Sequence, residues 1–191
     1  MRNLVLFMHT SLDGFVAGLN GEMDWIKVDE EIFDFVGKRV NRADTALYGR
    51  VTYEMMQAYW PTAGDRPDAT RHDREHSRWY EKVEKIVLSK SMQGKTLPKT
   101  TIISGALQET LHRIKNGAGG DILMFGSPRA AHSLMAEELI DEYWLFVNPV
   151  LLGRGIPLFK SIKRQTSWTL KENHAFTCGV VVLGYVKHLS R

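Results

Sequence analysis

The sequence predicts one α/β domain over residues 1–191, with a mostly parallel central sheet and antiparallel strands at its C-terminal end. Short apolar strands alternate with amphipathic helices through the first three quarters of the chain. Two of these strands run through a glycine directly into a helix, at Gly49 and at Gly126. From Tyr143 onward the pattern changes to successive strand-like segments. With 43% hydrophobic residues, a chain of 191 residues can bury one sizeable core.

Composition excludes several classes of protein. The net charge is only +3 and there is no lysine–arginine run, so we expect no nucleic-acid partner. A single cysteine, Cys178, excludes an internal disulfide and a multi-cysteine zinc site, and we expect it to be buried. The apolar stretch from Leu4 to Met8 is too short for a signal peptide or a membrane span. We expect a cytoplasmic protein without membrane contacts.

That apolar stretch is the first predicted strand, and Ser11-Leu12-Asp13-Gly14-Phe15 follows it. Asp-Gly favours a turn, because aspartate bonds nearby backbone and glycine accepts positive φ. We expect a loop from this turn to about Trp25. Loops at strand ends often line sites, so Asp13 is either a turn former or a catalytic candidate.

A helix is predicted from Asp29 to Val40, with Phe33, Val36 and Val40 on its inward stripe. Asp29 lies on the same stripe, one turn before Phe33. It is therefore either the N-cap of the helix or a carboxylate that faces the interior, and the residue type favours the N-cap.

The first strand–glycine–helix unit comprises a strand from Thr45 to Tyr48, Gly49, and a helix from Val51 to Ala58 that Trp60-Pro61 ends. The free N–H groups at such a helix start attract phosphate. Arg50 is a cation in a first helical turn, which is unfavourable against the helix dipole unless an anion lies nearby. The alternative is a solvated surface arginine.

The segment from Thr62 to Arg74 is polar and is predicted to be a loop or lid, followed by a short helix from Ser77 to Val83. His72 and His76 have a spacing that suits metal ligands. No third ligand can be identified, so we expect a solvated polar helix and no metal.

Three further strands are predicted, followed by a closing antiparallel pair. The strands are Lys85–Leu88, Thr100–Ile103 and Asp121–Phe125, and the pair is Thr166–Glu172 with Val180–Val186. The almost fully apolar strand Asp121–Phe125 is typical of the centre of a parallel sheet. It runs into Gly126-Ser127-Pro128, where serine at the N-cap and proline at the first helical position predict a second helix start that offers N–H groups.

Taken together, these motifs resemble the dihydrofolate reductase superfamily. The resemblance is nearest to stand-alone proteins related to the reductase domain of the bifunctional riboflavin-biosynthesis enzyme. Five motifs carry it in order: Ser11–Phe15, Leu47–Glu54, Ile86–Ser89, Phe125–Ser127 and Pro149–Gly155. The resemblance implies a three-layer α/β/α fold of the dihydrofolate reductase type. Nucleophile-elbow, P-loop and Rossmann glycine motifs are all absent from the sequence.

The resemblance also implies a bound NADPH across the carboxyl ends of the strands. Three groups of residues would bind it: Gly49, Arg50 and Thr52; Leu88, Ser89 and Lys90; and Gly126 with Ser127. Arg50 would neutralise the 2′-phosphate or the pyrophosphate. Taken alone, Ser89 favours a turn hydrogen bond over a phosphate contact.

Hydride transfer needs the cofactor aligned with its acceptor and a source of protons. By the resemblance, Asp13 matches the carboxylate that faces the sugar of the riboflavin precursor, and Asp29 matches the acid on the first helix of dihydrofolate reductases. The implied activity is an NADPH-dependent reductase of a small heterocycle, nearest to 5-amino-6-(5-phosphoribosylamino)uracil reductase. The alternatives are a dihydrofolate or pterin reductase and a nucleotide-binding protein without turnover.

Two departures bear on the substrate. Phe7 and Phe15 stand where the riboflavin-type domain tends to carry basic residues, which weakens the case for a ribose-phosphate substrate. Four aromatic residues are either core or the lining of a pocket for a flat heterocycle: Phe15, Trp25, Phe33 and Trp60. We expect a homodimer formed through the apolar C-terminal strands.

Overall fold

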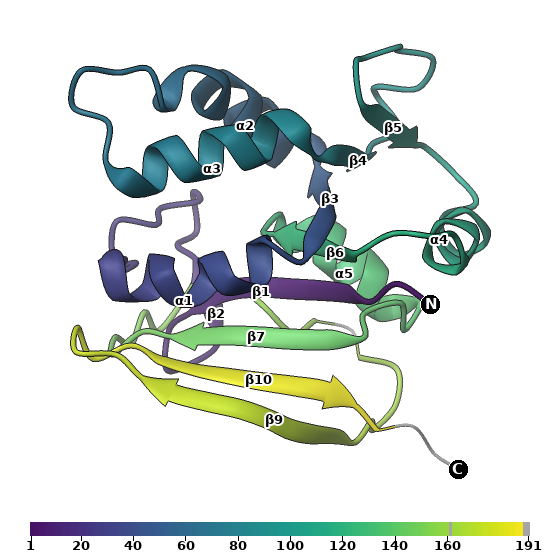
Figure 1. The fold of residues 1–191 in the computed structure, drawn as a ribbon. Helices are drawn as coiled ribbons and strands as arrows, with labels where there is room; N and C mark the ends of the chain where they lie inside the picture. The colour runs from purple at the N-terminus through teal and green to yellow at the C-terminus, as the bar shows by residue number, and fades with distance from the viewer. Residues whose placement is uncertain (161, 189–191) are drawn as a thin grey trace.

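The computed structural model describes residues 1–160 and 162–188, and an eight-stranded sheet runs through them (Figure 1). Its order is β5-β4-β3-β6-β1-β7-β10-β9. The strands are β1 (Leu4–Thr10), β3 (Ala43–Gly49), β4 (Glu84–Leu88), β5 (Thr100–Ile103), β6 (Asp121–Phe125), β7 (Glu142–Val147), β9 (Trp168–Ala175) and β10 (Val181–Lys187). A separate short ladder pairs β2 (Phe15–Ala17) with β8 (Ile156–Pro157).

The direction of the strands changes at one place in the sheet. From β5 to β7, all neighbouring pairs are parallel. β10 is antiparallel to both β7 and β9, and Figure 1 shows its arrow pointing the opposite way from theirs. A mostly parallel sheet with antiparallel C-terminal strands is thereby confirmed, and β6 lies between β3 and β1 as its apolar sequence predicts.

Helices cover both faces of the sheet, so the predicted three-layer architecture is also confirmed. The helices are α1 (Glu30–Val40), α2 (Arg50–Ala63), α3 (Arg71–Lys82), α4 (Leu107–Asn116) and α5 (Pro128–Ala136). The first three pack on the face that presents Phe7 and Leu123. The other two pack on the opposite face, against Leu6 and Met124 (Figure 1). None of the described helices is both long and apolar enough to cross a bilayer.

The region between β3 and β4 differs from the prediction. α2 continues through Pro61 to Ala63, although proline removes one N–H from the helix. Ser77 of the neighbouring helix bonds to the end of α2: its hydroxyl donates to the Trp60 carbonyl at 2.8 Å and accepts from the Gly64 N–H at 2.9 Å. Contacts between the two helices therefore stabilise an end that the local sequence disfavours.

α3 begins at Arg71, six residues before the predicted start, so the expected loop or lid over residues 62–74 is confined to residues 64–70, and the residues on either side of it are helical. A capping box begins the helix, in which Thr70 and Asp73 satisfy each other's backbone N–H groups. The spacing of these two residues is a recognisable helix-start signal, which the polar composition obscured. The expected burial of Cys178 is only partly realised, because the thiol lies half-buried in the turn between β9 and β10.

Candidate functional site

Two cavities lie side by side at the carboxyl ends of the parallel strands, which is where ligands bind in open α/β sheets. Tyr48 and Gly126 line the first cavity, and the residues that follow them, Gly49 and Ser127, line the second. The two strand–glycine–helix junctions are thus the boundary between the cavities. We name the first the aromatic cavity and the second the polar groove.

The two junctions are in direct contact. β3 pairs with β6, so the start of α2 is brought beside the start of α5. A Cβ atom on Gly49 would lie 2.2 Å from the Ser127 hydroxyl oxygen and 2.8 Å from the Ser127 Cβ. Ser127 has φ of 69°, which directs its side chain to Gly49, and its hydroxyl makes no capping bond. The helix start at Pro128 is as predicted, but capping by the serine side chain is not observed.

The polar groove has a volume of about 420 Å³. It is lined by Gly49, Arg50, Val51, Leu88, Ser89, Lys90, Ile103, Ser104, Gly105, Ala106, Leu107, Ser127, Arg129, Ala130 and Ser133. Six of the eight residues predicted to bind the cofactor are among them. Gly126 lies in the aromatic cavity instead, and Thr52 lines neither space.

Three cations and four serine hydroxyls in the groove suit a phosphorylated ligand. Arg129 and the segment from Ser104 to Ala106 were missed by sequence reasoning, although Arg129 directly follows the predicted helix start at Pro128. Arg50 pairs with Glu54 at 2.7 Å in a partly exposed i,i+4 ion pair. That ion pair with Glu54 accounts for a cation at the helix start, and such exposed pairs contribute little stability.

Ser89 accepts from the Met92 N–H at 3.2 Å. This is the turn hydrogen bond that was the alternative to a phosphate contact for Ser89.

The aromatic cavity has a volume of about 270 Å³, and the described residues put no aspartate, glutamate, lysine or arginine in its wall. It is lined by Phe7, Met8, His9, Val16, Met23, Ile26, Val28, Ile32, Phe33, Val36, Tyr48, Met56, Trp60, His72, His76, Phe125, Gly126 and Phe146. Two of the four predicted pocket aromatics, Phe33 and Trp60, are present, whereas Phe15 and Trp25 are not. Its polar groups are those of three histidines, the Tyr48 hydroxyl and the Trp60 indole N–H, which donates to the Met56 sulfur at 3.0 Å, so it suits an uncharged flat ring.

The prediction that His72 and His76 lie on a solvated polar helix is wrong. Both face the cavity, because α3 packs its inner side against Trp60 and Phe125. The His76 ring centroid is 4.1 Å from that of Trp60, and burial lowers the pKa of His76 to about 3. His72 stacks on Phe33 at 3.7 Å, and burial lowers its pKa as well. Both imidazoles are therefore neutral at physiological pH.

Asp13 is exposed and is fully engaged in hydrogen bonds. Its carboxylate accepts from the Ser11 hydroxyl at 2.6 Å, the Gly153 N–H at 2.7 Å and the Leu152 N–H at 3.2 Å. The Ser11 hydrogen bond is the largest cause of a lowered pKa for Asp13, and the two N–H groups add to it. Asp13 thus holds the glycine-rich turn at residues 152–153 to the end of β1.

Asp29 is the N-cap of α1, and its carboxylate accepts from the Ile32 N–H at 2.9 Å. It does not line the aromatic cavity, although Val28 and Ile32 on either side of it do. The structure thus gives both candidate carboxylates a local structural task and does not bring them together.

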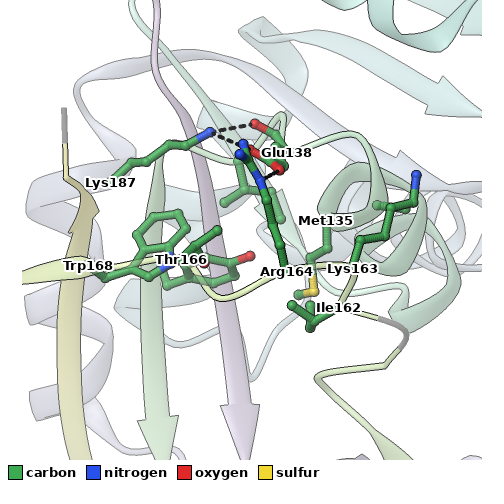
Figure 2. Close-up of a pocket in the computed structure, with 11 residues that line it drawn as sticks. Met135, Glu138, Ile162, Lys163, Arg164, Thr166, Trp168 and Lys187 are labelled. Carbon is green, nitrogen blue, oxygen red and sulfur yellow. Dashed lines mark hydrogen bonds and ion pairs between the residues drawn. The ribbon is translucent and has the colours of Figure 1, made fainter. Parts of the chain in front are cut away.

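A third, much smaller space of about 40 Å³ lies at the opposite end of the sheet (Figure 2). Glu138 occupies its rim, where it pairs with Arg164 and with Lys187 at 3.6 Å. Its size admits little more than water. Within residues 1–160 and 162–188, no group of three histidine, cysteine or acidic side chains is placed to hold a metal ion.

Comparison with known proteins assigns the chain to a family. The family described as "RibD C-terminal domain" matches residues 2–182. The uncharacterised protein YyaP of Bacillus subtilis (strain 168) is 31% identical over 186 residues, which cover 96% of this chain and 94% of that protein.

Two solved structures share the fold at low identity. A diaminohydroxyphosphoribosylaminopyrimidine deaminase/5-amino-6-(5-phosphoribosylamino)uracil reductase from Thermotoga maritima is 15% identical with a TM-score of 0.66, over 98% of this chain and 57% of that one. A dihydrofolate reductase from Enterococcus faecalis, complexed with NADP(H), is 16% identical with a TM-score of 0.61, over 97% and 96% of the two chains. The fold is therefore of the dihydrofolate reductase type, and the chain belongs to the RibD C-terminal domain family.

Proposed function

We propose that the protein is an NADPH-dependent reductase of a small heterocycle. The observation that carries the proposal is the adjacency of a cationic, serine-rich groove and an uncharged aromatic cavity, which meet at Gly49 and Gly126. A reductase needs one site for a polyanionic cofactor and another for a flat acceptor, with the reacting parts at their boundary.

The lining of the polar groove fits NADPH by its chemistry. Arg50, Lys90 and Arg129 would neutralise phosphates, and the N–H groups at the starts of α2 and α5 would donate to them. When bound, NADPH would supply the hydride. The protein would orient the two ligands. The apolar side chains that line the aromatic cavity, among them Phe7 and Phe146, would exclude water from the acceptor.

The nearest named activity is 5-amino-6-(5-phosphoribosylamino)uracil reductase, of the riboflavin-biosynthesis type. The cavity wall has no cation to hold a phosphate, so a phosphoribosyl group would have to extend beyond it. An uncharged ring such as a pterin is the alternative that this lining favours. A nucleotide-binding protein without turnover is the non-enzymatic alternative, and a cytoplasmic location stays a prediction.

The proposed function is tested by titrating the purified protein with NADPH and NADH and following tryptophan fluorescence. We expect micromolar binding with a preference for NADPH. Loss of NADPH absorbance on adding pyrimidines and pterins would then identify the acceptor. Failure of both cofactors to bind would contradict the proposal, while binding without oxidation by any acceptor would support the non-enzymatic alternative.

Arg50→Ala tests the assignment of the 2′-phosphate. We expect NADPH binding to weaken about tenfold, as for loss of one charge-assisted hydrogen bond, and NADH binding to change much less. Glu54→Ala is the matched control, because it removes only the intrahelical partner of Arg50. Equal losses for the two cofactors would show that Arg50 does not contact the 2′-phosphate.

We further propose that Asp13 or Asp29 supplies the proton to the reduced substrate. Replacement of the responsible residue by asparagine should slow hydride transfer from bound NADPH by about a hundredfold, the scale of general acid catalysis. Asp24→Asn, an exposed change in the same region, is the control. If single-turnover rates are unchanged in both variants, neither carboxylate has this role.

We also propose a homodimer that forms through the C-terminal strands. On the face of β10 that turns away from α1, Val181, Leu183 and Tyr185 alternate with buried residues, and Leu170 of β9 lies beside Tyr185. Leu170 and Val181 are exposed there. Leu170→Lys should shift sedimentation toward the monomer, whereas Thr169→Lys on the opposite face of β9 should not. A monomeric wild-type protein would contradict this assembly.

A further inference from the structure

We propose that His9 is the hydrogen-bond donor of the aromatic cavity and binds a ring nitrogen or carbonyl oxygen of the substrate through its Nε2–H group. The inference rests on the proposed function and names a residue that recognises the acceptor. His9 is the penultimate residue of β1, at the carboxyl end that faces the cavity. Its ring stacks on Phe146, with centroids 4.9 Å apart and planes at 23°.

Asn148 is fully buried and contacts the His9 ring. Its Oδ1 accepts from the Lys27 N–H at 2.9 Å, and its Nδ2 donates to the Phe146 carbonyl at 3.0 Å. A second carbonyl, that of Thr10, lies 3.3 Å from Nδ2. Backbone N–H and carbonyl groups cannot exchange roles, so these contacts determine which end of the amide is nitrogen.

The orientation of Asn148 in turn determines the tautomer of His9. The amide nitrogen of Asn148 lies 3.2 Å from Nδ1 of His9 and cannot accept a hydrogen bond, so this contact disfavours a proton on Nδ1. A proton on Nδ1 would place two donors against each other. The ring is kept neutral because burial lowers the pKa of His9 to about 4. The single ring proton therefore lies on Nε2.

Nε2 is available to a ligand. It has no hydrogen-bond partner among the described residues. The only buried side-chain N or O atom without a partner in that part of the chain is the Tyr48 hydroxyl oxygen, so the unpartnered Nε2 is not fully buried. His9 is part of the cavity wall, so its Nε2 can be reached from the cavity. No charged side chain in that wall competes for the donor.

A neutral imidazole donor matches the chemistry of hydride acceptance. As a hydride adds to carbon of a C=N or C=O group, negative charge develops on the nitrogen or oxygen, and a fixed N–H donor stabilises it. His9 keeps its own proton in this role, so the proton that completes the reduction comes from another group. His9 also selects substrates, because a ring without an acceptor would leave Nε2–H unpaired.

Two measurements test this assignment. Selective ¹⁵N-histidine NMR at pH 7.5, with the His9 signals identified by their loss in His9→Gln, should show a neutral ring protonated at Nε2. A proton on Nδ1, or on both nitrogens, would overturn the proposal.

The second measurement compares quinoline with naphthalene, which has the same shape and no acceptor, by chemical-shift titration at pH 8 without cofactor. We expect the wild type to bind quinoline about tenfold more tightly, and the ratio to fall to about one in His9→Phe. His76→Phe, a matched change in the same cavity, should keep the preference, and His9→Gln, which retains a donor, should keep part of it. Absence of a quinoline preference in the wild type, or its loss only in His76→Phe, would overturn the proposal. Because NADPH is not used, a failure here is distinct from failure of the cofactor site.

Discussion

Gly49→Ala is expected to destabilise the protein by about 3 kcal/mol, the scale of overpacking a well-filled position. The Gly49 backbone, with φ of −80° and ψ of 162°, is compatible with alanine, so the cost is steric. The new methyl group would lie 2.8 Å from the Ser127 Cβ, which no rotation of the serine side chain can relieve. Urea denaturation of the variant and the wild type measures the loss.

Ser127→Gly should reverse most of that loss, because it removes the two atoms closest to the methyl group and leaves only the Ala130 Cβ, at 3.4 Å. Glycine also accepts the φ of 69° at this position, so the single variant should be close to wild type in stability. In the double variant we expect a favourable coupling of about 2 kcal/mol, as for residues in direct contact.

Gly126→Ala is the matched control for this pair of substitutions. Gly126 has φ of 75° and no atom within 4 Å of an added Cβ, so its cost is conformational. Ser127→Gly should therefore not rescue it. If Gly49→Ala and Gly126→Ala respond alike to Ser127→Gly, the contact between the two junctions does not determine stability.

Acid is expected to destabilise the protein through the histidines of the aromatic cavity. Their pKa values are lowered from 6.5, to about 4 for His9 and about 3 for His76. The unfolded chain therefore binds more protons than the folded chain between these values and 6.5, and stability falls as the pH decreases through that window. From pH 7.5 to pH 5 each of the two should contribute a loss of about 2 kcal/mol, measured by urea denaturation.

His76→Phe should remove the contribution of His76 and reduce the pH dependence by about half. The groups that face His76 are Trp60, His72, Trp79 and Phe125, with Asp73 acting weakly in the opposite direction, so phenylalanine suits the site. His112→Gln, on an exposed position of α4, should leave the dependence unchanged. A wild-type stability that is equal at pH 7.5 and pH 5 would show that these imidazoles are not buried as neutral groups.

Much of the fold could be predicted because its signals are local. The strands at Thr100–Ile103 and Asp121–Phe125 have the predicted bounds, since apolar runs between turn residues determine them within a few residues. The N-cap of α1 at Asp29 follows from a residue type that satisfies a free N–H group within one turn. The start of α5 at Pro128 follows from the fixed φ of proline, which suits the first helical position. The error at the end of α2 occurs where packing between helices overrides the local signal of Pro61, whereas the error at the start of α3 is a missed local signal, the capping box of Thr70 and Asp73.

The residues of the candidate site were likewise predictable only in part. Six of the eight predicted cofactor residues line one groove, because strand–glycine–helix junctions in a parallel sheet all open at the same edge. The roles of Asp13, His72 and His76 could not be predicted, since each depends on a partner far along the chain. Asp13 bonds to Gly153, 140 residues away, and no local pattern indicates that contact.

The sequence by itself therefore determined most of the order of strands and helices, the two strand–glycine–helix junctions and the family resemblance, because each depends on short stretches of neighbouring residues. Only the tertiary structure decided that Gly49 contacts Ser127, that α3 turns its histidines toward an aromatic cavity, and that Asn148 selects the tautomer of His9. These features depend on which side chains are brought together when distant strands pair, and on how far burial removes them from water.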